Sequence, residues 1–292
     1  MGVFRKPVAV VESDAASAHR LGMIRDLTFE VVPLKSLTCA MDALPAGATV
    51  SVTCSPTKGI AETQRVTAEL TERGFTAIPH VAARMVRDRA HARELAAWFR
   101  TLGLRKVFLV GGDAEEPGEY PGAVEFLRDL LDTDHGLATI GVAAYPDGHA
   151  FLSDQTLRDK ERLLASAGID AYCSTQMCFD PITLGKWMRA VREQGIEMPI
   201  QLGISGVVDK TKLMTMGVRL GIGQSLSYLK KNKAAVAKML TATSYDPNDL
   251  LIPLSDDMVD MNVTGLHVFT FNQVGATDAW RRQVSEAVEQ RV

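Results

Sequence analysis

Short apolar runs alternate with amphipathic segments along the whole chain. Eight of the runs have the length and the Val, Ile, Thr and Phe content of β-strands, and they cover residues 27–33, 49–55, 76–83, 106–113, 139–146, 171–177, 199–205 and 265–272. Many of them lack strict alternation of apolar and polar residues. This pattern is typical of parallel strands that are buried on both faces.

Helical periodicity fills the intervals between these runs. It predicts helices over residues 60–74, 87–103, 123–133, 155–168, 182–195, 209–217, 224–240 and 276–292, and a connecting loop with a helical part over 241–260. The first of these helices ends at Gly74 and has acidic residues early and an arginine late, as helix dipoles and caps favour. Eight strands, each followed by a helix, predict a (β/α)8 barrel with an extra helix, in one domain spanning residues 1–292. A doubly wound open sheet is the structural alternative.

Composition narrows the class of protein. The chain has 292 residues, of which 46% are hydrophobic and 23% charged, and a formal net charge of −3. The acidic balance argues against a nucleic-acid partner, and the lack of an apolar run of about 18 residues argues against a membrane span. The N-terminus has no apolar stretch of signal-peptide length. The spacing of the four cysteines (Cys39, Cys54, Cys173 and Cys178) fits neither a zinc site nor a disulfide framework. We therefore expect a cytoplasmic location.

Polar residues gather at the predicted carboxyl ends of the strands, where barrel enzymes carry their chemistry. They are Glu30, Thr53, His80, Asp113, Tyr145, His149, Gln176, Ser205 and Asn272. Glu30 stands out because a carboxylate is rarely buried without a partner or a task. Gln176 has four hydrogen-bonding sites to satisfy, which favours a polar ligand. His80 is as consistent with a satisfied structural histidine, and Asp113 follows two glycines that form a turn or allow close approach of a ligand.

Several common site motifs are absent. The chain has no P-loop, no G-x-G-x-x-G after the first strand, no nucleophile-elbow serine and no histidine pair of the metal-binding type, so we expect no metal site. Residues 221–225 open a predicted helix and fit either an anion site or a simple serine cap. The residues alone indicate a barrel enzyme with an acid and several amides, which does not name a reaction.

The order of the motifs, however, resembles the methylenetetrahydrofolate reductase family from Leu27 to about Ala279. The matching segments are Phe29-Glu30-Val31-Val32-Pro33, Val52-Thr53, Pro79-His80, Gly112-Asp113 with Tyr120, Ala143-Ala144-Tyr145-Pro146 with His149, Ala167-Gly168 with Thr175-Gln176 and Phe179-Asp180, Gly217-Val218-Arg219, and Phe269-Thr270 with Asn272. No single segment is specific, but their shared order is.

The resemblance implies a reaction and roles for its residues. In the family, methylenetetrahydrofolate opens to an N5-iminium cation when N10 takes a proton, and hydride then converts the methylene to a methyl group. Glu30 corresponds to the acid that delivers the proton, and apolar surroundings favour the protonated form of a carboxyl group. Asp113 and Gln176 correspond to the pair that binds the pterin, and Asp113 also stabilises cationic intermediates. Asn272 belongs to the substrate-binding set.

The resemblance also implies FAD as cofactor, with NADH or NADPH as hydride donor. The corresponding positions are Thr53, His80, Gly112, Asp113, Tyr120, Ala144, Tyr145, His149, Lys160 and Arg162. Three departures weaken the flavin assignment. Gly111 replaces the arginine of the family's R-G-D turn, Gln273 replaces an arginine after the last strand, and Lys160 and Arg162 align with the family's basic pair only after an insertion. A flavin-free variant, in which NADH transfers hydride directly to the folate, therefore stays open.

Other interpretations also stay open from the sequence. The reaction could run in the oxidative direction, the chain could be a folate- or flavin-binding subunit without turnover, or it could be a methyltransferase that uses the same pterin. Apolar helical segments at 225–231 and 276–284 leave room for a homo-oligomer, although ordinary barrel packing explains them equally well.

Overall fold

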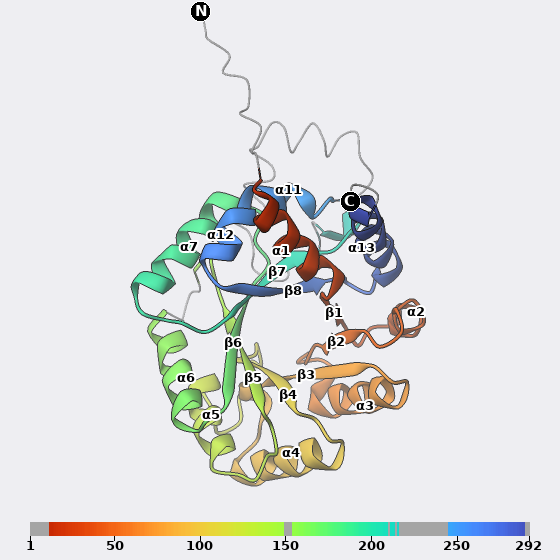
Figure 1. The fold of residues 1–292 in the computed structure, drawn as a ribbon. Helices are drawn as coiled ribbons and strands as arrows, with labels where there is room; N and C mark the ends of the chain where they lie inside the picture. The colour runs from red at the N-terminus through yellow and green to blue at the C-terminus, as the bar shows by residue number, and fades with distance from the viewer. Residues whose placement is uncertain (1–11, 149–153, 210, 214, 216–244, 290–292) are drawn as a thin grey trace, which may run out of the picture.

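The computed structural model describes residues 12–148, 154–209, 211–213, 215 and 245–289, and it contains a closed barrel of eight parallel strands (Figure 1). Neighbours in the chain are neighbours in the barrel, and β1 pairs with β8 to close it. The closure confirms the predicted (β/α)8 barrel and excludes the open, doubly wound sheet.

The bounds of the elements agree closely with the predicted runs, except that the pattern did not predict the short helices α2 and η1. The strands are β1 (Thr28–Val31), β2 (Thr49–Val52), β3 (Thr76–Ala82), β4 (Lys106–Val110), β5 (Thr139–Ala144), β6 (Asp170–Thr175), β7 (Ile200–Ser205) and β8 (Val263–Phe269). The helices between and after them include α2 (Leu37–Asp42), α3 (Gly59–Glu72), α4 (Arg89–Thr101), α5 (Ala123–Leu131), α6 (Asp154–Ser166), α7 (Pro181–Glu193) and α13 (Val274–Glu289). A short 3-10 helix, η1 (Ala83–Met85), follows β3.

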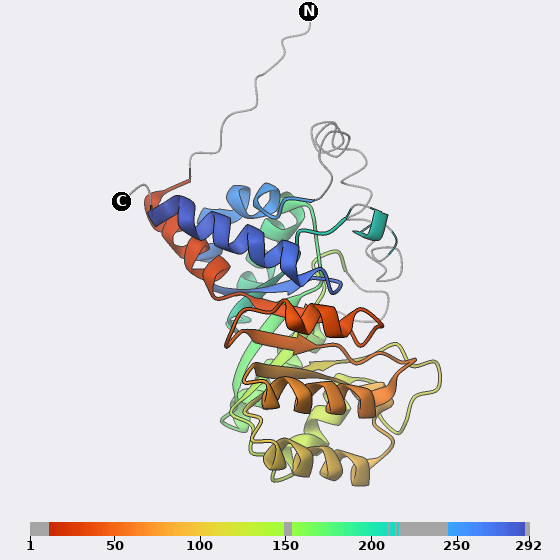
Figure 2. The same cartoon turned by 90° about the vertical axis from the view of Figure 1, so that its right-hand side faces the viewer.

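Further helices that the pattern did not predict lie around β8. α1 (Asp14–Arg25) precedes the barrel, begins at Ser13, whose hydroxyl accepts from the backbone N–H of Ala16, and packs against α12, α13 and β8 (Figures 1 and 2). The expected loop over 241–260 contains, in its described part, α11 (Asn248–Leu251), η2 (Ile252–Leu254) and α12 (Ser255–Asp260), which confirms its helical part. The helix predicted over 224–240 and residues 217–219 and 221–225 lie outside the described residues. Of the helix predicted over 209–217, residues 209, 211–213 and 215 are described, and 211–213 and 215 are helical.

The strands face two different layers because successive side chains point to opposite sides. The outward side chains are aliphatic and fully buried against the helices, as for Val50, Leu109, Val142 and Ile204. Burial of each such side chain stabilises the fold by roughly 1.5–3 kcal/mol. Because some inward side chains, such as Ile78 and Phe108, are apolar as well, these strands appear in the sequence as apolar runs without strict alternation.

The inward side chains are mixed, and they include aromatic rings. Phe108 of β4 lies with its ring centroid 5.7 Å from that of His267 on β8, on the opposite side of the barrel, so both must point inward. Phe108 also packs with Ile78 and Tyr172 in a small apolar cluster of its own. The ring of Tyr172 occupies the space that a side chain at Gly141 would need, because a Cβ at Gly141 would lie 2.2 Å from Cζ of Tyr172.

Backbone and side-chain hydrogen bonds tie the carboxyl ends of the strands together. The hydroxyl of Thr270 donates to the carbonyl of Glu30, and the backbone N–H of Gln176 donates to the carbonyl of Ala144. These bonds hold the segments that follow the strands in fixed positions around one end of the barrel, where the predicted site residues lie.

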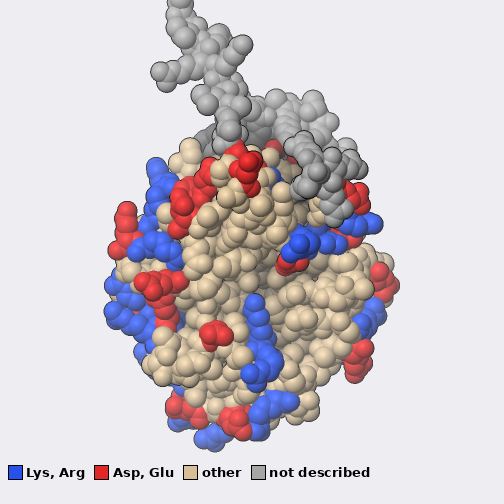
Figure 3. Space-filling view, viewed as in Figure 1, with Lys and Arg blue, Asp and Glu red and all other residues tan. Residues whose placement is uncertain are grey.

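Charged side chains of both signs are interspersed over the face shown in Figure 3, and neither sign forms a continuous field there. Within the described ranges, none of the helices combines the length and the apolar character needed to cross a bilayer.

Candidate active site

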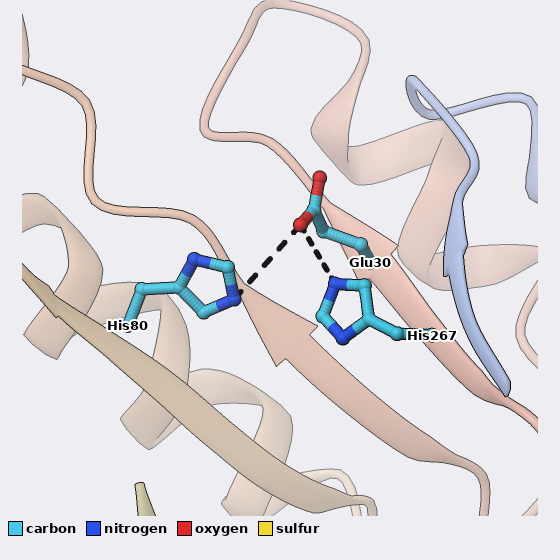
Figure 4. A group of neighbouring side chains, drawn as sticks. All are labelled: Glu30, His80 and His267. Carbon is cyan, nitrogen blue, oxygen red and sulfur yellow. Dashed lines mark hydrogen bonds and ion pairs between the residues drawn. The ribbon is translucent and has the colours of Figure 1, made fainter. Parts of the chain in front are cut away.

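A group of polar side chains occupies the barrel interior near the end of β1. It consists of Glu30, Ser51, His80 and His267, from β1, β2, β3 and β8, and we call it the polar layer. Nε2 of His267 lies 2.8 Å from Oε2 of Glu30, and Nε2 of His80 lies 3.9 Å from the same oxygen (Figure 4). Nε2 of His80 is also 2.7 Å from the hydroxyl of Ser51. The parallel register explains the meeting, because it pairs Glu30 with Ser51 and with Phe269, two residues after His267.

Burial makes these contacts strong. The exposed fractions are 4% for Glu30, 7% for His80 and 3% for His267. Hydrogen bonds and charge interactions are stronger in such surroundings than in water, and an unpaired polar group is costly there. Burial, followed by the influence of His267, holds the pKa of His80 well below its ordinary value, so that His80 is neutral at physiological pH. Glu30 therefore has one close imidazole partner and one more distant neutral imidazole.

Aromatic rings enclose the polar layer. Phe108 packs 4.8 Å from the ring of His80, and Phe269 packs 5.2 Å from the ring of His267. These contacts restrict the rotamers of both histidines and keep water away from their faces. The arrangement suits a carboxyl group that exchanges one proton with a bound substrate.

The donor atoms of Glu30, His80 and His267 lie within 4.8 Å of one another, which is compatible with a metal ion by distance and by residue type. The distances instead fit hydrogen bonds, because the Glu30–His267 separation of 2.8 Å and the His80–Ser51 separation of 2.7 Å are those of direct bonds. We therefore assign no metal to the polar layer. The predicted lack of a metal site stays a prediction.

Asp113 and Gln176 lie at the same end of the barrel as Glu30, because they follow β4 and β6. Asp113 is exposed. Burial, and after it the charge of Asp113, raises the pKa of Tyr145, so Asp113 lies near the phenol of Tyr145, which follows β5. Gln176 is half-buried, and its side-chain oxygen accepts from the backbone N–H of Met177. No hydrogen bond or ion pair joins either of them to Glu30 among the described residues, so their proposed common ligand stays a prediction.

Two of the predicted cofactor positions have local features that bear on ligand binding: Thr53 has a polar atom that a ligand could satisfy, and Gly112 lets two backbone segments approach each other closely. Oγ1 of Thr53, directly after β2, is buried and has no hydrogen-bond partner among the described residues. Gly112 has a φ of +86°, and a Cβ there would lie 2.8 Å from Cβ of Ala82. The chain after β4 can therefore approach the end of β3 only with glycine at this position.

Other predicted cofactor positions are engaged within the protein. The hydroxyl of Tyr120 donates to Asp129, its ring packs on Phe126, and burial and Asp129 raise its pKa. The side chain of Ala144 belongs to the outer apolar core. His149 lies outside the described residues.

Lys160 and Arg162, the predicted basic pair, have different surroundings on one helix, and their role in cofactor binding stays a prediction. Lys160, on α6, is 4% exposed, and its charge interacts with Cys173 of β6 and Glu125 of α5. Burial lowers the pKa of Lys160 to about 8. Arg162 is exposed on the same helix. This placement of Lys160 between helix and barrel wall gives no support to a phosphate-binding role, because a buried amine is not reachable by a phosphate.

Asn272 is used by the backbone of the neighbouring loop. Its side-chain oxygen accepts from the N–H of Val32, and its Nδ2 donates to the carbonyl of Val32 and to Ser36. Asn272 has a φ of +64° and thus shapes the chain after β8 while it fixes the chain after β1. Gln273, where the family has an arginine, accepts from the backbone N–H of Asp209. These bonds give Asn272 a structural task, and its role in substrate binding stays a prediction.

Sequence reasoning did not single out His267 and Ser51. Both lie inside strands rather than at their ends, where we sought chemistry. A signal existed in the alternation within β8, because Leu266 and Val268 belong to the outer core whereas His267 and Phe269 do not. Reading the strands by parity would have placed His267 on the interior face with Glu30.

Comparisons with known proteins identify the family of the chain and support its fold. A family model described as methylenetetrahydrofolate reductase matches residues 31–284. Among solved structures, an uncharacterized protein from Clostridium thermocellum that binds two copies of 5-methyl-5,6,7,8-tetrahydrofolic acid has a TM-score of 0.60 and 10% identity, over 95% of this chain and 100% of that one. An apo-form protein from Toxoplasma gondii ME49, assigned as a deoxyribose-phosphate aldolase, has a TM-score of 0.45 and 12% identity, over 94% and 98% of the two chains, and we rest nothing on it. The first structure supports the fold, and the family match spans most of the chain. The chain therefore belongs to the methylenetetrahydrofolate reductase family.

Proposed function

We propose that the protein reduces 5,10-methylenetetrahydrofolate to 5-methyltetrahydrofolate with NADH or NADPH, or catalyses the reverse oxidation. The observation that carries this proposal is Glu30, a carboxyl group that is 4% exposed, bonded to His267 and held inside the barrel of a family member. A buried carboxyl group in this position serves no evident packing purpose. Its chemistry matches the proton delivery that opens the folate ring.

The proposed reaction has two steps. A proton passes from the Glu30 carboxyl group to N10 of the substrate, the bond between N10 and the methylene carbon breaks with its electron pair on N10, and an N5-iminium cation forms. Hydride then attacks the methylene carbon and gives the methyl group. The carboxylate left on Glu30 is stabilised by its hydrogen bond to His267. Asp113 and Gln176 bind the pterin in this proposal, and the nearby charge of Asp113 favours the cationic intermediate.

The Clostridium thermocellum protein supports the substrate class. That protein binds a methylated tetrahydrofolate and shares the fold of this chain along its full length, although the identity is 10%. We infer that the barrel described above accepts the same class of ligand.

The residues fit a flavin only in part. The hydroxyl of Thr53, which has no hydrogen-bond partner in the described part of the chain, fits a polar ligand at the end of β2, whereas the buried Lys160 does not fit the flavin pyrophosphate. Gly111 and Gln273 also stand where the family has arginines. We therefore route no step through FAD, and the burial of Lys160 favours the second form of the proposal, direct transfer of hydride from NADH or NADPH to the folate.

The test is the oxidation of NADH and NADPH by the purified protein, followed by absorbance with and without methylenetetrahydrofolate. The proposal predicts oxidation that depends on the folate and yields 5-methyltetrahydrofolate. A visible-absorption scan of the same preparation separates the two forms, since bound flavin is yellow. Tight binding of tetrahydrofolate without consumption of either nucleotide would instead indicate a binding subunit or a methyltransferase.

A further inference from the structure

The two oxygens of the Glu30 carboxyl group have different surroundings. Oε2 faces both imidazoles, at 2.8 Å from His267 and 3.9 Å from His80. Oε1 has no hydrogen-bond partner among the described residues, and it is not among the fully buried polar atoms that lack one. Oε1 therefore retains some accessible surface, and Figure 4 shows it directed away from both imidazole rings.

The tautomer of His267 follows from the acceptors around it. Oε2 of Glu30 is an acceptor at hydrogen-bond distance from Nε2, and no hydrogen bond is formed at Nδ1 with any described residue. A buried N–H without an acceptor is rarer and costlier than an unused lone pair. We therefore assign the hydrogen to Nε2, which donates to Oε2.

We propose that His267 is a positioning residue for Glu30: its Nε2–H occupies Oε2, so that the proton delivered to the substrate resides on Oε1, the accessible oxygen. This proposal rests on the proposed function. When the Oε1–H bond breaks and the proton moves to N10, the negative charge left on the carboxylate is stabilised by the same N–H donor, and His267 itself neither gains nor loses a proton.

The second histidine cannot replace the first. Nε2 of His80 is 2.7 Å from the hydroxyl of Ser51 but 3.9 Å from Oε2 of Glu30, and the buried ring of His80 is neutral at physiological pH. Glu30, His80 and His267 are the titratable groups of the polar layer. Lys106 and Tyr172, also inside the barrel, interact with each other through the amine and the ring face. The acid in this arrangement depends on one donor, that of His267.

Two substitutions separate the donor from the shape of the side chain. His267→Phe keeps a ring among the neighbouring rings and removes the donor, whereas His267→Gln places an amide N–H at a similar distance from the backbone. Tyr172→Phe is the matched control, because it alters an interior ring that has no contact with Glu30. In His267→Phe, kcat should fall about 10²-fold, the loss typical of a misplaced catalytic group. KM for the folate should change little.

The pH profile distinguishes positioning from general damage. Loss of the donor disfavours the carboxylate, so the alkaline limb of kcat/KM should move to higher pH in His267→Phe. His267→Gln should recover most of kcat and keep the limb near its wild-type position, and Tyr172→Phe should leave both unchanged. A uniform loss of kcat in both His267 variants without a shift of the limb would contradict the proposal.

A measurement without substrate keeps this result separate from the reaction itself. Infrared difference spectra against Glu30→Gln report the protonated fraction of the Glu30 carboxyl group as pH is raised. The proposal predicts that His267→Phe retains the proton to higher pH than wild type, and that His267→Gln resembles wild type. If the Glu30 carboxyl group titrates identically in His267→Phe and in wild type, and the wild type is active, the role of His267 is overturned while the proposed function stands. A wild type without reductase activity would contradict the proposed function and, with it, this role. One zinc or iron ion per chain by elemental analysis, lost in His267→Phe, would also overturn it.

Discussion

Replacing Gly141 with alanine should overfill the barrel interior at the site where Tyr172 packs. A Cβ at this position would lie 2.2 Å from Cζ, 2.4 Å from the hydroxyl oxygen and 2.6 Å from Cε1 of Tyr172. All three distances are shorter than van der Waals contact permits. The ring has little room to move, because it is 5% exposed, packs with Phe108, and has the amine of Lys106 4.1 Å from its centroid.

The expected cost is that of an overpacked core. Such substitutions cost about 1–3 kcal/mol, and we expect the upper half of this range because the overlap involves a ring within a packed cluster. For a domain of this size the loss corresponds to a fall of several degrees in Tm. Gly22→Ala, on α1, is the matched control, since nothing lies within 4 Å of the added methyl group and alanine favours helix.

The assay is urea unfolding of wild type, both single variants, Tyr172→Leu and the double variant Gly141→Ala/Tyr172→Leu. If the contact with Tyr172 causes the loss, the two changes should couple favourably by about 0.5–3 kcal/mol, so that the double variant is more stable than additivity predicts. Unchanged stability of Gly141→Ala, or strictly additive effects, would refute the argument that this glycine makes room for the ring.

Three further predictions concern the barrel mouth and two buried basic side chains. Gly112→Ala should lower the free energy of unfolding by about 2 kcal/mol and reduce activity, because it displaces Asp113. Gly168→Ala, at a φ of +67° with no neighbour within 4 Å, should show the effect of backbone strain alone, and thermal unfolding and kcat/KM are compared for the two variants. Because burial depresses the pKa of His80 below 6.5, the folded state disfavours its protonation, and stability should decline as pH falls below about 6.5. In urea unfolding between pH 7.5 and 5.5, the stability of His80→Gln should decline less steeply than that of wild type, and equal declines would contradict the assignment. Lys160→Met should raise the free energy of unfolding in urea at pH 7 by about 1–3 kcal/mol, because burial lowers the lysine pKa from 10.5 to about 8 and thus penalises the charged form. A variant less stable than wild type would show that a partner of the amine compensates for this penalty.

The barrel could be predicted from sequence because its outer core leaves a strong signal. Residues such as Val50, Val142 and Ile204 make continuous apolar runs together with buried interior neighbours, and glycines such as Gly74 end the helices. α1 was missed because its buried face is narrow, and its packing against α12 and α13 depends on contacts far apart in the chain.

The candidate site could be predicted only in part. Glu30 was identified because a carboxyl group in an apolar strand is unusual, whereas His267 lies in mid-strand and its meeting with Glu30 depends on closure of the barrel between β8 and β1. Lys160 was matched by alignment, which does not report which side of α6 faces the barrel wall. Pairings across the barrel and the inward or outward direction of a helix residue are properties of the tertiary structure, and spacing along the chain does not encode them directly.

The most direct test of the account is the rate of folate-dependent NAD(P)H oxidation in Glu30→Gln. Glutamine is close to glutamate in shape and its amide oxygen can still accept from His267, so circular dichroism and Tm should stay near those of wild type. Because the amide cannot deliver the proton, kcat should fall by about 10²–10⁴-fold. A variant with a rate close to that of wild type, from a wild-type protein that turns over methylenetetrahydrofolate, would contradict the assignment of Glu30 as the acid.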